Sequence, residues 1–424
     1  MRSSSWYNKK IVKKIVFPII PHVLKNHNFV KLWTSQICTV LGINIVNYIL
    51  LLHLYKNTNS TLAASFLWIA FSIPVLLVGP FASTIVDLVN RKKLLTLTTL
   101  LQCLTILLFL LPGQRLFLIY AIMLLYSLFS QFYGPAEAAT LPIIVAKEDL
   151  PEATGMFLFT GQVGRLLGFG VAGFLAKFIG FNPTLIACSM LLGLAFLSVL
   201  SLPIIHIRKK VDVEQDLSHF FAKVAEGYRY IKNNRYVLQP LLLSSGSEIT
   251  MLIIAITIPA IAKEIIQIPP EDAALYIIIP AMFGGMTGIF SFTRLLRRGI
   301  RKIALIQKGL IGLVLAFFVI GLLLERLPLT ARLILLPIIS FVAGMSFTGI
   351  QVPSQTYLQE TTPKDMLGRL WGNLWFMMTI ITVIPMFLSA TLTEFLGVHT
   401  LFTILGIGIF AVYLYIKKHT MEEK

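Results

Sequence analysis

The sequence predicts an all-α membrane protein with twelve transmembrane helices in two six-helix halves and both termini in the cytoplasm. Three observations support this fold class. Of the 424 residues, 56% are hydrophobic and only 13% are charged, about half the charged fraction of a typical soluble domain. The mean hydropathy is +0.82, so we expect lipid to surround much of the chain. One long polar connector, residues 206–236, interrupts the apolar segments near the middle.

A helix that crosses the roughly 30 Å hydrocarbon core needs about 20 mainly apolar residues. Twelve segments meet this requirement: 31–54, 61–86, 94–112, 116–138, 153–178, 184–205, 237–262, 271–293, 303–324, 332–358, 367–393 and 396–416. The predicted halves are therefore 31–205 and 237–416. We expect 1–30 to be a basic cytoplasmic lead and 417–424 a cytoplasmic tail. An apolar face within 206–236 predicts an amphipathic helix at the inner surface.

The net charge of +17 does not indicate a nucleic-acid partner, because the basic residues lie in short connectors between apolar segments. In the chosen orientation most of them are cytoplasmic, as the positive-inside rule requires. The exceptions on the outer side are Lys56, Arg115, Lys177, Lys263, Arg326 and Arg332. We therefore expect a multi-pass protein of the cell membrane, in bacteria the inner membrane.

Short motifs recur about half a chain length apart. "RKKLL" from Arg91 has a counterpart in "RKIAL" from Arg301, and "KEDL" from Lys147 resembles "KDML" from Lys364. Both pairs are in register with the count of spans, which indicates a duplicated six-helix unit. Many secondary transporters are duplicated in this way, with the substrate site near the membrane midplane between the halves.

The stretch "GPFASTIVDLVNRKKLL" (79–95) resembles the signature between helices 2 and 3 of the major facilitator superfamily, with Gly79, Asp87, Arg91 and Lys92 in the matching places. "FYGPAEAATLP" (132–142) and "QVPSQTYLQETTPKDMLGRLWG" (351–372) resemble the ends of helices 4 and 10 in the branch that holds the enterobactin exporter and macrolide efflux pumps. The resemblance implies the major facilitator fold and export of an amphipathic small molecule, such as a drug or a siderophore-like compound.

Gly79, Asp87, Arg91 and Glu137 are the candidate residues of a cytoplasmic gate. We expect Asp87 to face the N-terminus of the 367–393 helix, whose partial positive charge stabilises a carboxylate. Arg91 would pair with Glu137 at the inner end of the 116–138 span. Opening toward the cytoplasm would break this latch. In the alternative interpretation, the basic residues after Asp87 serve only as topology anchors.

Glu248 is the only acidic residue deep within a predicted span, about 11 residues or roughly 16 Å from the start of the 237–262 helix. An ionised carboxylate costs several kcal/mol at that depth, which favours partial protonation. Glu248 is therefore the candidate proton-coupling residue and, with Ser244, a candidate cavity residue. Two alternatives stay open: Glu248 binds a cationic substrate, or it has no role in transport and is either neutral or hydrogen-bonded to Ser244.

Arg165 lies deep within the 153–178 span among several glycines, which let that helix pack closely against a neighbour. It either neutralises an anionic substrate or bonds to backbone carbonyls. Asn44, Asn47 and Tyr48 share one face of the first span. They either line the substrate cavity or form hydrogen bonds between helices.

These features predict a secondary active transporter that couples efflux to protons by alternating access. No Walker A motif is present, which argues against ATP as the driver. An enzyme is not expected, because all seven histidines fall near or beyond span ends and one carboxylate alone is deep. We expect no cofactor and no metal. The expected partners are a small-molecule substrate, protons and the lipid bilayer, and the expected state is a monomer. The alternative is a lysophospholipid or other lipid translocator, or another facilitator of the same fold.

Overall fold

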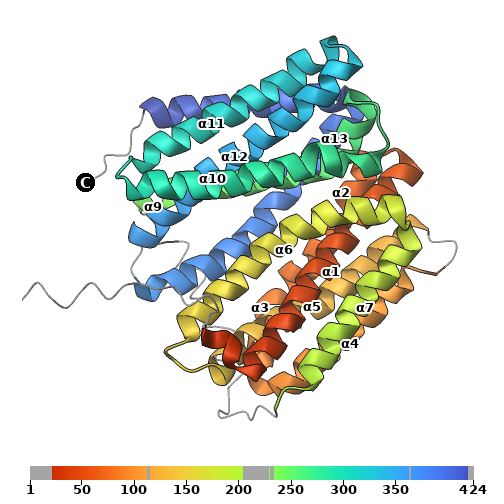
Figure 1. The fold of residues 1–424 in the computed structure, drawn as a ribbon, viewed down its shortest axis with the longest axis vertical. Coiled ribbons are helices and arrows are strands. Elements are labelled where there is room, and N and C mark those ends of the chain that lie inside the picture. Colours follow the sequence, from red (N-terminus) through yellow and green to blue (C-terminus); the bar gives the residue numbers. More distant parts are fainter. Residues whose placement is uncertain (1–21, 112–114, 204–228, 230–233, 362–363, 419–424) are drawn as a thin grey trace, which may run out of the picture.

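The structure is a computed structural model that describes residues 22–111, 115–203, 229, 234–361 and 364–418. Within these ranges all regular secondary structure is helical (Figure 1). Nearly all of the 206–236 connector, with its predicted amphipathic helix, lies outside the described residues. So do residues 1–21 of the predicted lead and the tail beyond Lys418.

The N-terminal half begins with a short 3₁₀ turn, η1 (His22–Lys25). The helices that follow are α1 (His27–Thr58), α2 (Thr61–Leu77), α3 (Gly79–Leu88), α4 (Arg91–Leu108), α5 (Leu116–Ile144), α6 (Leu150–Phe178) and α7 (Phe181–Leu200). Polar N-cap residues fix the first residues of three helices. The side chains of Asn26, Ser60 and Asn90 accept hydrogen bonds from backbone N–H groups in the first turns of α1, α2 and α4. Because Asn26 is a cap, α1 begins four residues before the predicted span.

The C-terminal half holds α9 (Arg235–Ala260), α10 (Ile279–Arg297), α11 (Lys302–Phe318), α12 (Leu329–Thr361) and α13 (Lys364–Lys418). Irregular turns gather at one end of this half. The π-helical turns are η2 (Ile261–Ile265), η4 (Ala274–Ile278) and η5 (Val319–Leu323), and the 3₁₀ turns are η3 (Pro270–Asp272) and η6 (Leu324–Arg326).

The structure divides one of the predicted spans and joins two others. The 61–86 span is divided at Val78 into α2 and α3, with Pro74 inside α2 and a proline in the first turn of α3. The last two predicted spans are joined in α13, whose helical geometry breaks at Gly397 (φ 80°, ψ 163°). This positive-φ conformation is one that glycine adopts without steric cost, so Gly397 separates two helices that follow each other without a loop.

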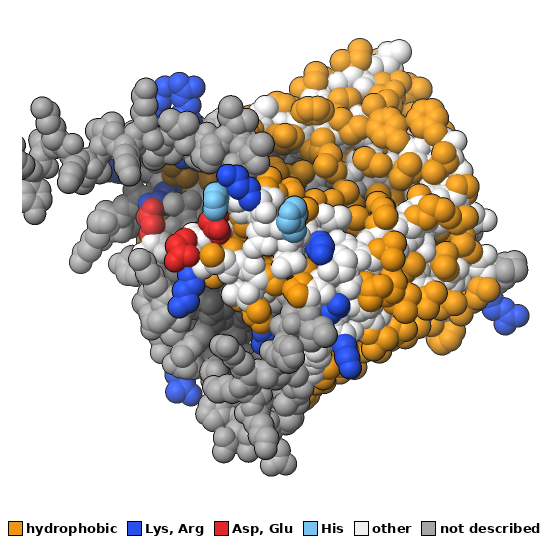
Figure 2. Space-filling model, turned by 60° about the horizontal axis from the view of Figure 1, so that its bottom comes forward, with side chains coloured by type: hydrophobic (Ala, Val, Ile, Leu, Met, Phe, Trp, Pro, Cys, Tyr) orange, Lys and Arg blue, Asp and Glu red, His pale blue; other side chains and the backbone are white. Residues whose placement is uncertain are grey.

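The two halves form separate bundles that meet along one side (Figure 1). In the N-terminal half α1 packs against α6 and α7, and in the C-terminal half α12 packs against α10 and α11. Nine helices of the described chain are long and apolar enough to cross a membrane. Large apolar side chains such as Phe117, Phe178, Phe290 and Phe395 are at least 74% exposed. On the face in Figure 2, hydrophobic side chains cover a wide area and most charged ones gather toward one edge. The chain is thus an all-α membrane protein.

Candidate functional site

Glu248 lies at the contact between α9 and α12, where a buried glutamine of α12 holds it. The Gln351 amide nitrogen donates to the Glu248 Oε1 at 3.2 Å and to the Ser244 carbonyl at 3.0 Å. The Ser244 hydroxyl donates to the Gln351 Oε1 at 2.6 Å, and Gln355 donates to the same oxygen at 3.2 Å. Gln351 is only 6% exposed. Its amide therefore fixes Ser244 and Glu248 relative to α12.

Gln351 is the functional candidate that sequence reasoning missed. It opens the quoted motif 351–372, yet nothing in its local sequence assigns it a role. The missing signal was its depth: Gln351 is a polar residue well inside the 33-residue helix α12, where an amide needs a hydrogen-bonding partner. A bond between Ser244 and Glu248 was one of the alternatives for Glu248; in the structure both residues contact Gln351.

Arg165 approaches Glu248 from the other half of the molecule. The guanidinium of Arg165, on α6, is close enough to interact electrostatically with the half-buried Glu248 carboxylate on α9. Its Nη2 also donates to the Oε1 of Gln162 at 3.1 Å, one turn earlier on α6. Arg165 of the N-terminal half is thus within electrostatic range of Glu248 of the C-terminal half.

The glycines around Arg165 determine how closely α6 approaches α1. A Cβ at Gly164 would lie 2.6 Å from a methyl of Val40, and one at Gly168 would lie 2.5 Å from the Asn44 Cβ. A side chain at Gly164 would have to displace the Val40 side chain, and one at Gly168 would meet the Asn44 Cβ and the nearby backbone of α1. The small residues therefore hold this stretch of α6 against α1 and fix the backbone that carries Arg165.

Asn44, Asn47 and Tyr48 are buried along α1. The Asn44 amide donates to the Val40 carbonyl at 2.7 Å. Tyr48 is fully buried, with its ring 5.5 Å from that of Phe169 on α6. The Asn47 Oδ1 and the Tyr48 hydroxyl are both buried, and neither has a hydrogen-bonding partner among the residues that the structure describes. In this conformation Asn44 and Tyr48 lie in the contact between α1 and α6, and their predicted contact with substrate stays a prediction.

Three of the predicted gate residues, Gly79, Arg91 and Glu137, lie on or beside the C-terminal part of α5. Gly79 is the first residue of α3. Arg91, the first residue of α4, donates to the Ala139 carbonyl at 3.0 Å. The buried Glu137 carboxylate accepts a 2.8 Å bond from the Tyr133 hydroxyl, which is 2.9 Å from the Ser35 hydroxyl of α1. The side chain of Asp87 lies outside the described part of the structure. The pairing of Arg91 with Glu137 also stays a prediction.

Comparison with known proteins identifies the relatives of this chain. The family model described as Major Facilitator Superfamily matches residues 32–384. Macrolide efflux protein A of Streptococcus pyogenes is 23% identical over 399 residues, which cover 91% of this chain and 94% of the relative. An uncharacterized MFS-type transporter of Bacillus subtilis, YfiS, is 22% identical over 84% of each chain.

Solved structures agree in fold. The crystal structure of the nucleoside transporter NupG has a TM-score of 0.68 at 12% identity and covers 93% of this chain and all of its own. A mutant of the peptide transporter POT in complex with sulfate has a TM-score of 0.71 at 11% identity, over 92% of this chain and 94% of that structure. At such low identity these neighbours share only the arrangement of the helices.

Proposed function

The chain belongs to the Major Facilitator Superfamily, and we propose that this secondary transporter exports an amphipathic small molecule in exchange for protons. Members of the family are transporters and not enzymes. Export is supported by the distant relationship to macrolide efflux protein A over most of both chains. The proposed substrate class is a drug-like or siderophore-like compound that enters from the cytoplasm or the inner leaflet.

The observation that carries proton coupling is the position of Glu248 between Gln351 on its own half and Arg165 on the other half. A nearby cation favours the charged form of a carboxylate, and burial away from one favours the protonated form. When the two halves rock, Gln351 moves together with Glu248, because both belong to the C-terminal half. Arg165, in the N-terminal half, changes its distance from Glu248. The carboxyl group would then take up a proton on one side of the membrane and release it on the other.

We propose twelve membrane crossings, with both termini in the cytoplasm of a bacterial cell. In this interpretation α2 and α3 together make one crossing, α4 makes another, and α13 makes two that are separated at Gly397. The basic connectors support this orientation. Gly79, Asp87, Arg91 and Glu137 would form the cytoplasmic gate, and Asn44, Asn47, Tyr48, Arg165, Ser244 and Glu248 would surround the substrate path.

Transport in inside-out vesicles tests the proposal directly. A pH gradient is imposed and followed with a pH-sensitive dye, while lipophilic cations, macrolides, catecholates and lysolipids are added one at a time. We expect one class to collapse the gradient with the wild-type protein but not with Glu248→Gln, which keeps the size and the acceptor oxygen but cannot ionise. Cys103→Ala, at a position on α4 in the N-terminal half, serves as the control for expression and insertion.

If radiolabelled substrate moves while the gradient stays intact, proton coupling is wrong. The protein would then be a facilitator or a lipid translocator with the same fold. If Glu248→Gln collapses the gradient as well as the wild type does, another residue carries the proton.

A further inference from the structure

The connector between α10 and α11 carries a dense cluster of positive charge, at the end of the C-terminal half opposite the turns η2 to η6 (Figure 1). Its arginines are Arg294, Arg297, Arg298 and Arg301. The first two lie in the last turn of α10, and the fourth directly precedes α11. The sequence contains no acidic residue between 273 and 324, so this cluster has no negative charge of its own.

The corresponding connector of the N-terminal half has a different composition. In the repeated motif Arg301 corresponds to Arg91, so Arg297 stands where the N-terminal half has Asp87. Arg91 is also held within its own half, by the bond to the Ala139 carbonyl at 3.0 Å. The second connector has an arginine in place of the acidic residue, and the predicted gate is therefore not repeated there.

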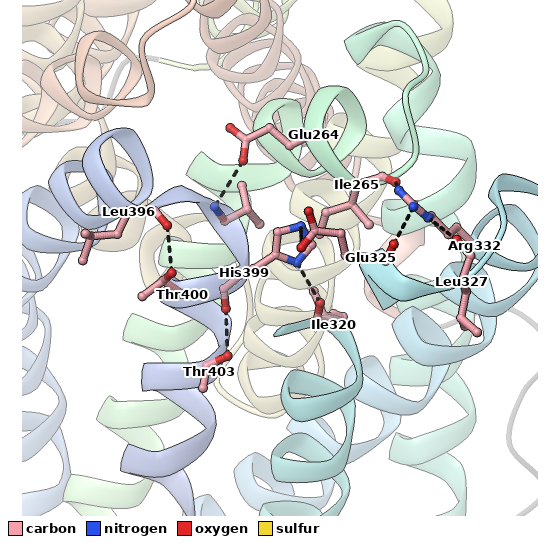
Figure 3. Close-up of polar contacts among 11 residues, drawn as sticks. Glu264, Ile265, Ile320, Glu325, Leu327, Arg332, Leu396, His399, Thr400 and Thr403 are labelled. Atoms are coloured by element: carbon pink, nitrogen blue, oxygen red, sulfur yellow. Dashed lines mark hydrogen bonds and ion pairs between the residues drawn. The ribbon is translucent and has the colours of Figure 1, made fainter. Parts of the chain in front are cut away.

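The four arginines of the cluster have unused hydrogen-bond donors. All four are exposed, and within the described part of the chain their side chains make no hydrogen bond or ion pair. Arg332, elsewhere in the same half, is different: as Figure 3 shows, it donates to the backbone carbonyls of Ile265, Glu325 and Leu327. The donors of Arg332 stabilise the fold, whereas those of the cluster are available to a ligand.

An exposed apolar stripe on α10 leads to this cluster. Phe283, Met286 and Phe290 are 53%, 43% and 74% exposed. Their spacing places them on one face of the helix, and Arg294 and Arg297 continue that face toward its end. The span predicted for this helix ends just before the two arginines. One face of α10 thus changes from apolar, at the level of lipid chains, to cationic, at the level of head groups.

A pocket of about 200 Å³ lies beside the cluster, between the connector and the end of α12. Gly299, Arg301, Thr356 and Glu360 are among the residues that line it. The Glu360 carboxylate is 2.8 Å from the Lys302 ammonium, so these two charges compensate each other and the charge of Arg301 remains. The start of α11, also at this pocket, has no side-chain cap, and its partial positive charge adds to that of Arg301.

We propose that the exposed face of α10 and this connector bind an anionic phospholipid. Arg294 and Arg297 would hold the phosphate diester, since each guanidinium can donate two parallel bonds to phosphate oxygens, and an acyl chain would lie along Phe283, Met286 and Phe290. Basic pockets between membrane helices bind anionic head groups. A zwitterionic head group adds an ammonium that the arginines repel, so the charge of the cluster selects an anionic lipid.

The proposal requires only that the chain lies in a bilayer, and it is independent of the substrate, of proton coupling at Glu248 and of the direction of transport. Native mass spectrometry of the delipidated full chain in detergent provides the test. The protein is titrated with phosphatidylglycerol and, in a parallel series, with phosphatidylcholine that has the same acyl chains. We expect the wild type to bind one phosphatidylglycerol with an affinity about tenfold or more above that for phosphatidylcholine.

Arg294→Gln combined with Arg297→Gln should abolish this preference, because the phosphate loses both of its cations. The matched control is Arg115→Gln combined with Arg326→Gln, which removes two exposed arginines at the opposite end of the bundles. The control variant should keep the wild-type preference. If the first double variant is not monodisperse, Arg297→Gln alone replaces it and should lower the preference about threefold or more.

Soluble glycerol phosphate serves as a competitor that offers the phosphate without the chains. At a concentration equal to that of the lipid it should not displace phosphatidylglycerol, because it cannot occupy the apolar stripe. Equal affinities of the wild type for the two lipids would overturn the proposal. So would an unchanged preference after the Arg294 and Arg297 changes, an equal loss in the control variant, or displacement by glycerol phosphate.

Discussion

The side chain of Gln351 connects the two helices of the candidate site. Its amide oxygen accepts a hydrogen bond from the Ser244 hydroxyl, and its amide nitrogen donates one to the Glu248 carboxylate. One side chain of α12 therefore sets the position of two side chains on α9. At this depth few other partners are available, and a lost bond leaves a polar group without compensation. The charge state of Glu248 and the packing of α9 against α12 are therefore linked through a single amide.

We predict that Gln351→Leu impairs transport more than it impairs folding. The change leaves the Glu248 carboxylate and the Ser244 hydroxyl without their partner, at a cost of about 1–2 kcal/mol for bonds between membrane helices. The melting temperature in detergent should fall by a few degrees, and substrate-driven proton movement should be lost. Gln355→Leu is the control, because it removes one bond to Gln351 and leaves the contacts of Glu248 in place. Equal losses in both variants would contradict the role assigned to Gln351.

Among the helices, α10 and α12 approach each other closely where each carries glycine. A Cβ at Gly284 would strike the Phe341 carbonyl, and one at Gly344 would strike the Ala281 carbonyl, so each glycine faces the backbone of the opposite helix. Lipid provides no hydrophobic drive for helix association, and close packing of small residues is a main source of stability. The packing of α10 against α12 therefore depends on these two positions.

We expect Gly344→Ala to destabilise the protein by about 1–3 kcal/mol, the usual range for overpacking. The added methyl group cannot be accommodated by a side-chain rotation, because the atom that it meets belongs to the backbone of α10. The melting temperature of purified protein, measured by fluorescence-detected size exclusion after heating, should fall. Gly408→Ala on α13 provides the comparison, since a Cβ at Gly408 would meet no atom of a neighbouring segment within 4 Å. A Gly344→Ala protein as stable as Gly408→Ala would refute the close packing.

Much of the helix pattern followed from the sequence, because hydropathy reports directly on the lipid environment. The predicted 332–358 span lies inside α12, and 31–54 lies inside α1. The break at Val78 was missed, since a helix can continue its apolar character across a change in backbone direction. The predicted division between the 367–393 and 396–416 spans lies within a few residues of the break at Gly397. In the candidate site, the depth of Glu248 was visible in the sequence, whereas its partner Gln351 is 103 residues away. Contacts at such separations depend on how helices pack, which hydropathy does not encode.

At the scale of the whole molecule, three of the six basic residues that the sequence predicts on the outer side connect the two halves. Lys56, Lys177 and Lys263 were placed on the outer side by the sequence, against the general bias of the basic residues. The structure gives all three of them partners on the opposite half. A positive charge on the outer side weakens the orientation signal, and the contacts of these three lysines with the opposite half offer a reason for keeping it.

The orientation itself can be tested at both ends of α11 and the turns that continue it (Lys302–Arg326), a helical segment long enough to cross the membrane. Arg298 is an exposed residue in the connector just before this segment, and Arg326 is its exposed last residue. With the basic connectors in the cytoplasm, a cysteine at Arg326 should react with an impermeant thiol reagent in right-side-out vesicles, and a cysteine at Arg298 should react only in inside-out vesicles. Lys418→Cys, at the end of α13, should behave like Arg298→Cys, because an even number of crossings separates the two positions in the twelve-helix topology. The opposite labelling pattern would invert the molecule, and the contacts of Lys56 and Lys177 with η3 would then lie on the cytoplasmic side. Labelling of Lys418→Cys from the outer side, with Arg298→Cys inside, would show that α13 does not turn back through the membrane at Gly397.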